Sequence, residues 1–286
     1  IYMIDFKSEV LKIKDQMIED IKMLCAIPST QDDNTVAEFA PFGKANRQAL
    51  DAMLKIGKRD GFKVEDVDGY AGHIDIGEGD ETFGILGHLD VVPVNKVGWD
   101  SDPFEVIIKD DKLYGRGVAD DKGPLLAGYY AAKIINSLNL PVKMKIRVIF
   151  GCNEELGSRC VKYYFSKKPY PKMGFTPDAS FPVVYGEKAG CEFVIEGNVE
   201  KGGLIYLSAG NRANIVPETC EAVICGNYKQ YVDSYKSFLS MNNLTGDIEE
   251  VGNHTKLVLK GKSAHASTPE EGINAVVYLC KYLATV

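Results

Sequence analysis

The stretch GILGHLDVVP, residues 84–93, decides the fold. Its apolar run ends at His88, and Asp90 follows two residues later. A strand that is apolar on both faces is typical of the buried parallel strands of α/β proteins. Because functional sites gather at the carboxyl ends of such strands, His88 and Asp90 are candidate site residues.

A second His-x-Asp pair, His73 and Asp75, lies in GHIDIG, residues 72–77. That segment alternates apolar and polar residues between two glycines, a pattern typical of a half-exposed strand. We therefore expect His73 to be a surface histidine beside a solvated acid.

Two further segments place acids at the ends of predicted elements. MKIRVIFGCNEE, residues 144–155, carries Glu154 and Glu155 just past an apolar strand, and GRGVADDKGP, residues 115–124, places Asp120 directly before a helix. Each acid taken alone fits a solvated carboxylate equally well. Adjacent glutamates at a strand end, however, repel each other unless a cation or a proton is shared.

A fourth segment, TPDASFP, offers Asp178 among prolines. Asp178 is also a plausible turn former, and Asp121 a plausible N-cap for the helix that starts at Lys122. Taken together, one imidazole and several carboxylates form a ligand set suited to zinc, manganese or cobalt.

The composition excludes several classes of protein. The 286 residues are 45% hydrophobic and 26% charged, enough for two cores. A net charge of −7, with lysines scattered among acids, argues against a nucleic-acid partner. No apolar stretch approaches the ~18 residues that span a bilayer, so we expect a cytoplasmic protein with no membrane partner. The seven cysteines lack C-x-x-C spacing and are predicted to pack as small apolar side chains.

Periodicity predicts helices over 8–25, 43–60 and 122–138 that alternate with buried strands, which indicates an α/β domain with a mostly parallel central sheet. After about residue 187 alternating strands predominate, namely CEFVIEGN, CEAVICGN and TKLVLKG, with a helix near 229–240. A last helix is predicted from Thr268 as N-cap, with Pro269 and Glu271 in its first turn. We expect two domains, 1–187 and 188–286.

Five ordered segments carry a family resemblance: GHLDVVP, W…DPF, KLYGRGVADDKGP, NEELGS and TPDASFP. Together they resemble the co-catalytic zinc peptidases and deacylases that include the carnosinase-like dipeptidases, and most nearly the bacterial dipeptidase V type. The resemblance runs from about residue 10 to 286. It implies a zinc-peptidase catalytic domain over 1–187 and the first part of an inserted α+β lid, which binds substrate, over 188–286.

The resemblance also implies a ligand for each of two metal ions. His88 and Asp178 bind one zinc, Glu155 binds the other, and Asp120 bridges the two. Asp90 then orients the His88 ring from behind. Manganese or cobalt are alternatives to zinc.

For catalysis, the resemblance implies that Glu154 is the general base, which takes a proton from a water whose pKa the metals lower. Asn214 and His265 reach over the substrate from the lid and stabilise the oxyanion. The peptide bond between Asp120 and Asp121 is implied to be cis.

The expected reaction is the hydrolysis of dipeptides. Deacylation of N-acyl amino acids or carboxypeptidase activity on the same scaffold is an alternative, as is a non-catalytic binding module. Family members return to the catalytic domain after the lid and add a further histidine to the second metal. No such return is present in the sequence, so we expect a fragment that lacks one metal ligand, is inactive by itself, and is a monomer or homodimer.

Overall fold

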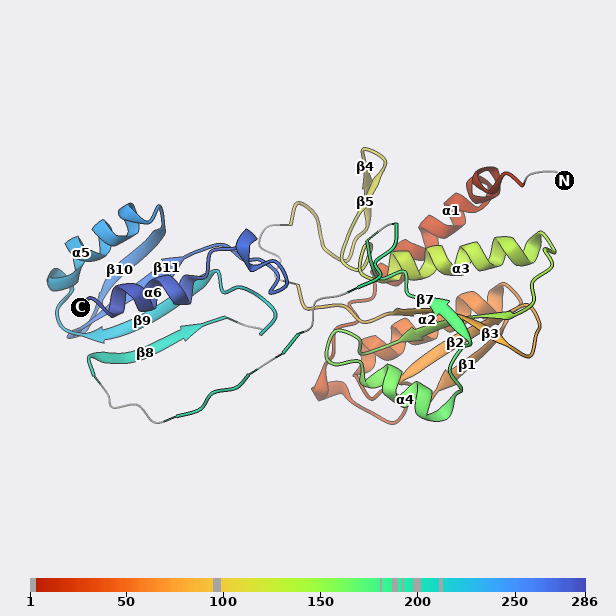
Figure 1. Cartoon of the computed structure of the whole chain (residues 1–286), viewed down its shortest axis with the longest axis horizontal. Helices are drawn as coiled ribbons and strands as arrows, with labels where there is room; N and C mark the ends of the chain where they lie inside the picture. The colour runs from red at the N-terminus through yellow and green to blue at the C-terminus, as the bar shows by residue number, and fades with distance from the viewer. Residues whose placement is uncertain are drawn as a thin grey trace. The chain divides into compact units, whose positions relative to one another are not determined.

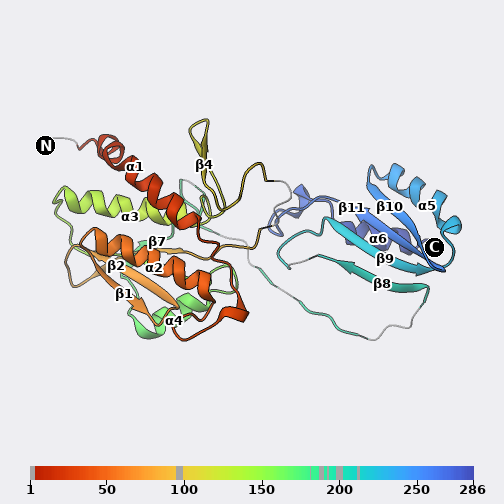
Figure 2. The same cartoon turned by 180° about the vertical axis from the view of Figure 1, so that it is seen from behind.

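The structure is a computed structural model in which the chain divides into two compact units, Ile1–Val184 and Tyr185–Val286. The sequence had predicted the boundary at residues 187 and 188. Figures 1 and 2 show the elements of each unit. The residues described are 4–94, 99–180, 182–186, 190–191, 193–197, 202–210 and 213–286.

The first unit is built on a mixed five-stranded sheet in the order β1-β2-β6-β3-β7. Strand β3 pairs in parallel with both β6 and β7, whereas β1–β2 and β2–β6 are antiparallel pairs. This confirms the predicted α/β class, with a sheet that is mixed and whose parallel pairings are β6–β3 and β3–β7. The strands are β1 (Lys63–Val67), β2 (Ala71–Ile76), β3 (Thr82–His88), β6 (Lys145–Gly151) and β7 (Met173–Phe175).

The parallel pairing explains why distant acids meet. In the register of β3 and β6, His88 lies opposite Gly151, so both strands end at the same edge of the sheet. The backbone N–H of Leu89 continues the pairing by donating to the carbonyl of Gly151 at 2.8 Å. Strand β7 runs in the same direction, so the segment that carries Asp178 also leaves the sheet at this edge.

Four helices cover the sheet of the first unit. They are α1 (Phe6–Cys25), α2 (Lys44–Arg59), α3 (Lys122–Ser137) and α4 (Arg159–Lys167). The first three share the main core with the sheet. Helix α4 adds Cys160 to that core and packs through Tyr164 against a small cluster on the other face. Both views show α4 on the side of the sheet away from α1 and α3 (Figures 1 and 2). A two-stranded hairpin, β4 (Ile107–Lys109) and β5 (Lys112–Tyr114), turns at residues 110–111, as the sequence predicted.

The expectation of a surface-exposed His73 was wrong, because helix α4 covers the face of β2 that carries it. The ring is 3% exposed, and its Nδ1 lies 3.0 Å from the hydroxyl of Tyr164. Its Nε2 lies 3.5 Å from a carboxylate oxygen of Glu65. Asp75 is not solvated but paired with Arg147 through bonds of 2.7 and 2.8 Å.

The second unit is an antiparallel four-stranded sheet in the order β10-β11-β9-β8, with its core between the sheet and two helices. The strands are β8 (Leu204–Ala209), β9 (Thr219–Cys225), β10 (Thr245–Val251) and β11 (His254–Lys260). The helices are α5 (Tyr228–Met241) and α6 (Ala275–Leu283). This arrangement has the predicted α+β character.

Three local predictions were wrong in physical detail. Residues 193–197 of the predicted strand CEFVIEGN form no strand. Helix α6 begins at Ala275, and its N-cap is Asn274, whose side chain accepts hydrogen bonds from two backbone N–H groups. Thr268 instead precedes a short 3-10 turn and makes no capping bond.

The cysteines only partly follow the prediction. Four are buried as small apolar side chains: Cys25, Cys152, Cys160 and Cys220. Three are exposed: Cys191, Cys225 and Cys280. Among the described residues, no helix is both long and apolar enough to cross a membrane, and the cytoplasmic location stays a prediction.

Candidate metal centre

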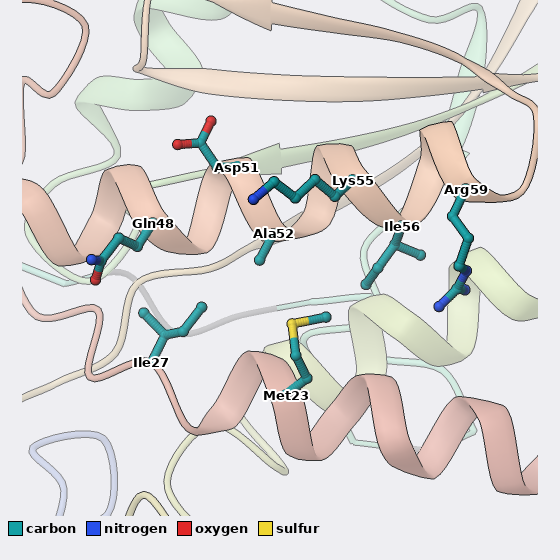
Figure 3. A pocket seen from close by; sticks show the side chains of 8 residues that line it. All are labelled: Met23, Ile27, Gln48, Asp51, Ala52, Lys55, Ile56 and Arg59. Carbon is teal, nitrogen blue, oxygen red and sulfur yellow. The ribbon is translucent and has the colours of Figure 1, made fainter.

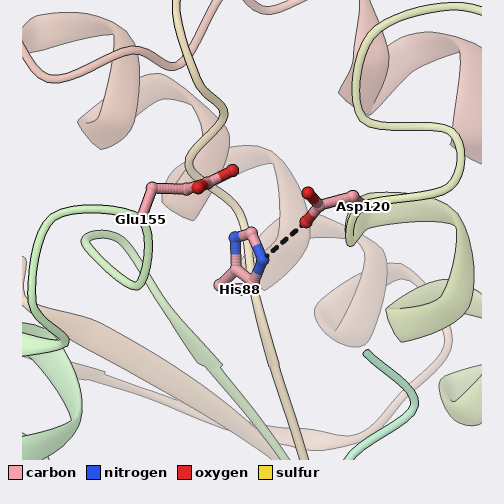
Figure 4. Close-up of side chains that lie close together, drawn as sticks. All are labelled: His88, Asp120 and Glu155. Carbon is pink, nitrogen blue, oxygen red and sulfur yellow. Dashed lines mark hydrogen bonds and ion pairs between the residues drawn. The ribbon is translucent and has the colours of Figure 1, made fainter. Parts of the chain in front are cut away.

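The imidazole of His88 is the centre around which the acids gather. It is buried at the end of β3, and its Nε2 lies 3.0 Å from Asp120 Oδ1, 3.5 Å from Asp178 Oδ2 and 4.0 Å from Glu154 Oε2. Figure 4 shows Asp120 and Glu155 on either side of the His88 ring. The structure therefore brings acids from three separate segments of the sequence to a histidine from a fourth.

Two groups of side chains offer ligand atoms within 4.8 Å of one another: His88, Asp120 and Glu155, and His88, Glu154 and Asp178. Each group supplies one imidazole nitrogen and two carboxylate oxygens. These are donors that zinc and manganese accept, so the residues present fit a divalent ion. All the residues predicted as ligands belong to one group or the other.

Asp90 holds this arrangement from behind. His88 Nδ1 lies 2.9 Å from the carbonyl oxygen of Asp90 and 3.4 Å from its Oδ1. The two carboxylate oxygens of Asp90 also accept hydrogen bonds from the backbone N–H groups of Glu154 and Glu155, at 2.9 and 3.1 Å. Asp90 thus holds the ring mainly through its backbone carbonyl and the loop of the two glutamates through its carboxylate. The contact with the glutamate loop was not predicted from the sequence.

Asp121 has a different task from the one predicted. It occupies the N-cap position of α3, but its side chain makes no capping bond. Instead its Oδ2 accepts a hydrogen bond from the backbone N–H of His88 at 3.0 Å, while its Oδ1 has no partner within the described residues. The peptide bond between Asp120 and Asp121 is cis. A Cβ at Gly87 would approach Asp121 Oδ2 to 2.3 Å, so only glycine fits before His88.

The crowding of carboxylates shifts the pKa values of His88, Glu154 and Glu155. Burial alone lowers the pKa of His88, but the hydrogen bonds with Asp120, Asp178 and Asp90 outweigh it and raise the pKa far above its ordinary value. Burial, reinforced by the neighbouring acids, raises the pKa of Glu154, and it raises that of Glu155 to about 7. Such values are typical of acids that lack a compensating cation.

Asn214 and His265, the residues predicted to contact substrate, lie on two paired loops of the second unit. Ile215 and His265 form an isolated bridge, and the backbone N–H of Ala266 donates to the carbonyl of Asn214 at 2.8 Å. Both side chains are exposed, and His265 lies outside any helix, as predicted. His265 Nδ1 accepts a hydrogen bond from the backbone N–H of Ser267 at 3.1 Å.

A hollow of about 480 Å³ between α1 and α2 lies apart from the acids (Figure 3). Two of its charged residues have partners within the protein: Asp51 is bound by Arg47, and Arg59 by Asp20. None of its lining residues belongs to the two ligand groups.

Comparison with known proteins agrees with the geometry. Residues 84–273 match the model of peptidase family M20/M25/M40. The chain belongs to this family.

Two bacterial relatives match nearly the whole chain. A protein of Staphylococcus epidermidis is 39% identical over 290 residues, and one of Staphylococcus aureus is 40% identical over 290 residues. Both are named "Putative dipeptidase", and each match covers 98% of this chain and 62% of the relative. The chain therefore spans less than two thirds of the length of these curated relatives.

Among solved structures, human carnosine dipeptidase 1 is similar with a TM-score of 0.47 and 27% identity. The dipeptidase Dug1p of Saccharomyces cerevisiae has a TM-score of 0.48 and 21% identity. Each of these matches covers 56% of this chain and 36% of the other.

Proposed function

We propose that the first unit carries the catalytic centre of a metal-dependent dipeptidase. The observation that supports this most is the convergence of Asp120, Glu154, Glu155 and Asp178 on the buried His88. The names of the two staphylococcal relatives support dipeptides as the substrate class. The second unit would bind substrate through Asn214 and His265.

In this proposal His88 and Asp178 would hold one ion and Glu155 the other, and Asp120 would serve as a ligand of both. Zinc is the expected metal, with manganese or cobalt as alternatives. When bound, the ions polarise the attacking water and the peptide carbonyl. Asp90 keeps the ring of His88 oriented through its Nδ1.

Glu154 would act as the general base. One of its carboxylate oxygens accepts a proton from the attacking water and returns a proton to the amine that leaves. Burial raises the pKa of Glu154, which brings it nearer to the pH at which such proton transfer is efficient. The backbone N–H of Glu154 donates to Asp90 Oδ1, and this bond fixes the position of the base.

The test is hydrolysis of a dipeptide panel by Glu154→Gln, made in the longer parent protein that the sequence predicts as well as in this chain, which is expected to be inactive by itself, with the zinc content of each protein measured alongside. Since general bases contribute roughly 10²- to 10⁴-fold to rates, we expect kcat to fall by at least about 10²-fold while zinc is retained. Glu78→Gln is the matched control, because Glu78 is 91% exposed and its nearest partner, Lys63, is 4.0 Å away.

Unchanged hydrolysis in Glu154→Gln would overturn the role of the base. A protein without bound divalent ions would overturn the metal centre. Hydrolysis of acetyl or succinyl amino acids in place of dipeptides would replace the substrate class and leave the centre intact. The oligomeric state, monomer or homodimer, stays a prediction.

A further inference from the structure

Lys122 is a fully buried lysine beside the metal centre that the proposed chemistry does not use. It is the first residue of α3 and follows the Asp120–Asp121 pair directly. Its exposed fraction is 0%, and within the described part of the chain the partners of its ammonium are backbone carbonyls and not carboxylates. Burying an ammonium group costs free energy unless hydrogen bonds to the protein replace those it made with water, so its acceptors show what the residue does in the fold.

The ammonium donates to two backbone carbonyls of another segment. Nζ lies 2.9 Å from the oxygen of Leu24 and 2.8 Å from that of Ile27. Leu24 lies in the last turn of α1, where a positive charge is favourable, and its carbonyl also accepts from the backbone N–H of Ile27 at 3.2 Å. Lys122 therefore joins the start of α3 to the end of α1 and to the loop that follows it.

That loop leads directly to the segment that carries Asp90. The hydroxyl of Ser29 donates to the carbonyl of Leu89 at 2.6 Å, and the carbonyl of Ser29 accepts from the N–H of Val91 at 3.0 Å. Ser29 thus binds the backbone on both sides of Asp90. It is itself fully buried, so no water competes for these bonds.

The same segments meet again around Gly117. A Cβ there would lie 3.1 Å from Lys122 Cδ, 3.3 Å from Val91 Cγ1 and 3.5 Å from Cys25 Sγ. Gly117 precedes Asp120 by three residues and has a φ of +85°, a conformation that suits glycine. The stem of Lys122 is therefore packed where α1, the Asp90 segment and the Asp120 segment touch.

We propose that Lys122 is a positioning residue of the metal centre, which fixes Asp90 relative to Asp120 through the loop of Ile27 and Ser29. The inference rests on the proposed metal centre. Asp90 in turn holds His88 and the backbone of the two glutamates, so a shift of its segment would move ligands of both groups.

The same helix offers a control that separates positioning from general stabilisation. Lys133 of α3 also joins two elements, since its Nζ lies 2.8 Å from Asp60 Oδ2 at the end of α2. It contacts none of the ligand residues. Lys133→Met should destabilise the first unit without changing the metal centre.

The experiment measures zinc affinity by competition with a chromogenic chelator, and urea unfolding, for the wild-type chain, Lys122→Met, Ser29→Ala and Lys133→Met. Because residues behind metal ligands change affinity by about 10- to 100-fold, we expect at least about a tenfold loss of zinc affinity in Lys122→Met and Ser29→Ala. Lys133→Met should keep the wild-type affinity within about twofold and unfold at lower urea.

Wild-type zinc affinity in both Lys122→Met and Ser29→Ala would overturn the inference, as would an equal loss in Lys133→Met. If Lys122→Met does not fold, Ser29→Ala decides alone, since it breaks the same connection at its other end. Failure of the wild-type chain to bind zinc, manganese or cobalt would instead refute the metal centre, and the inference with it.

Discussion

The buried His73 makes the stability of the first unit depend on pH. Burial, and then the positive charge of Arg147, lower the pKa of His73 to about 4, against opposing effects of Asp75 and Glu65. The neutral ring is the form that the folded protein favours, with its Nδ1 3.0 Å from the hydroxyl of Tyr164. An unfolded chain has no such preference.

The sign and size follow from the two pKa values of the ring. Between its ordinary pKa of 6.5 and the folded value of about 4, the unfolded chain binds more protons than the folded one. The contribution of His73 is therefore complete above the unfolded pKa and is lost as the pH falls towards the folded pKa. At about 1.4 kcal/mol per pKa unit the full loss is about 3 kcal/mol, and about 2 kcal/mol of it falls between about pH 7 and pH 4.5.

The assay compares urea unfolding of the wild-type chain and His73→Asn at these two pH values. Asparagine keeps an oxygen that accepts a hydrogen bond from Tyr164 but does not titrate. The chain has one tryptophan, Trp99, which lies in the first unit, so its fluorescence reports on that unit. Both proteins share the acids of the metal centre, and their difference isolates His73.

We expect the free energy of unfolding to fall by about 2 kcal/mol more in the wild-type chain than in His73→Asn on acidification. Equal pH dependence in the two proteins would refute the reasoning, because it would mean that the ring titrates alike in both states. A larger loss in His73→Asn would contradict the sign itself.

Two further predictions test the packing around the centre and the helices beneath it. Gly87→Ala places a Cβ 2.3 Å from Asp121 Oδ2. We therefore expect weaker zinc binding in chelator competition, and a free energy of unfolding in urea that is lower by about 1–3 kcal/mol. Wild-type zinc affinity in this variant would contradict the placement of Asp121. Tyr130→Phe removes a buried hydroxyl that donates to Asp20 Oδ2 at 2.6 Å. Because hydrogen bonds to charged groups are worth about 1.5–3 kcal/mol, we expect the free energy of unfolding in urea to fall by about that amount. Tyr114→Phe on the exposed hairpin is its control and should change the urea midpoint little.

Much of the fold could be predicted from periodicity because long amphipathic elements leave a strong pattern. The helices expected at 43–60 and 122–138 are found at Lys44–Arg59 and Lys122–Ser137. Start signals were less dependable, since Thr268 and Pro269 suit the first turn of a helix and a 3-10 turn equally. Which of them forms depends on tertiary contacts, and here Asn274 has the capping geometry.

The members of the candidate site were predictable for a geometric reason. Parallel strands that end at one edge deliver whatever follows them to one place, so His88, Glu154 and Asp178 meet without any knowledge of their contacts. The burial of His73 was not predictable in this way, because alternation along β2 shows that the faces differ but not that α4 covers the polar one.

The acids of the centre fall into two kinds: positioning acids, whose carboxylates accept hydrogen bonds from the backbone, and candidate metal ligands, whose carboxylates face His88. A sequence does not show this difference, because it depends on backbone hydrogen bonds. Asp90 and Asp121 are buried, and backbone N–H groups donate to both carboxylate oxygens of Asp90 and to Oδ2 of Asp121. Asp120, Glu154 and Asp178 keep 52%, 44% and 34% of their side chains exposed and direct an oxygen towards His88 Nε2. In the described part of the chain, neither these three carboxylates nor that of Glu155 accepts a hydrogen bond from a buried backbone N–H, so all four can turn to a cation without leaving one unpaired. Replacing a positioning acid such as Asp90 should therefore displace several candidate ligands together, because it anchors both His88 and the backbone of the two glutamates. Replacing a candidate ligand such as Asp120 should remove one metal-binding side chain and leave the others in place.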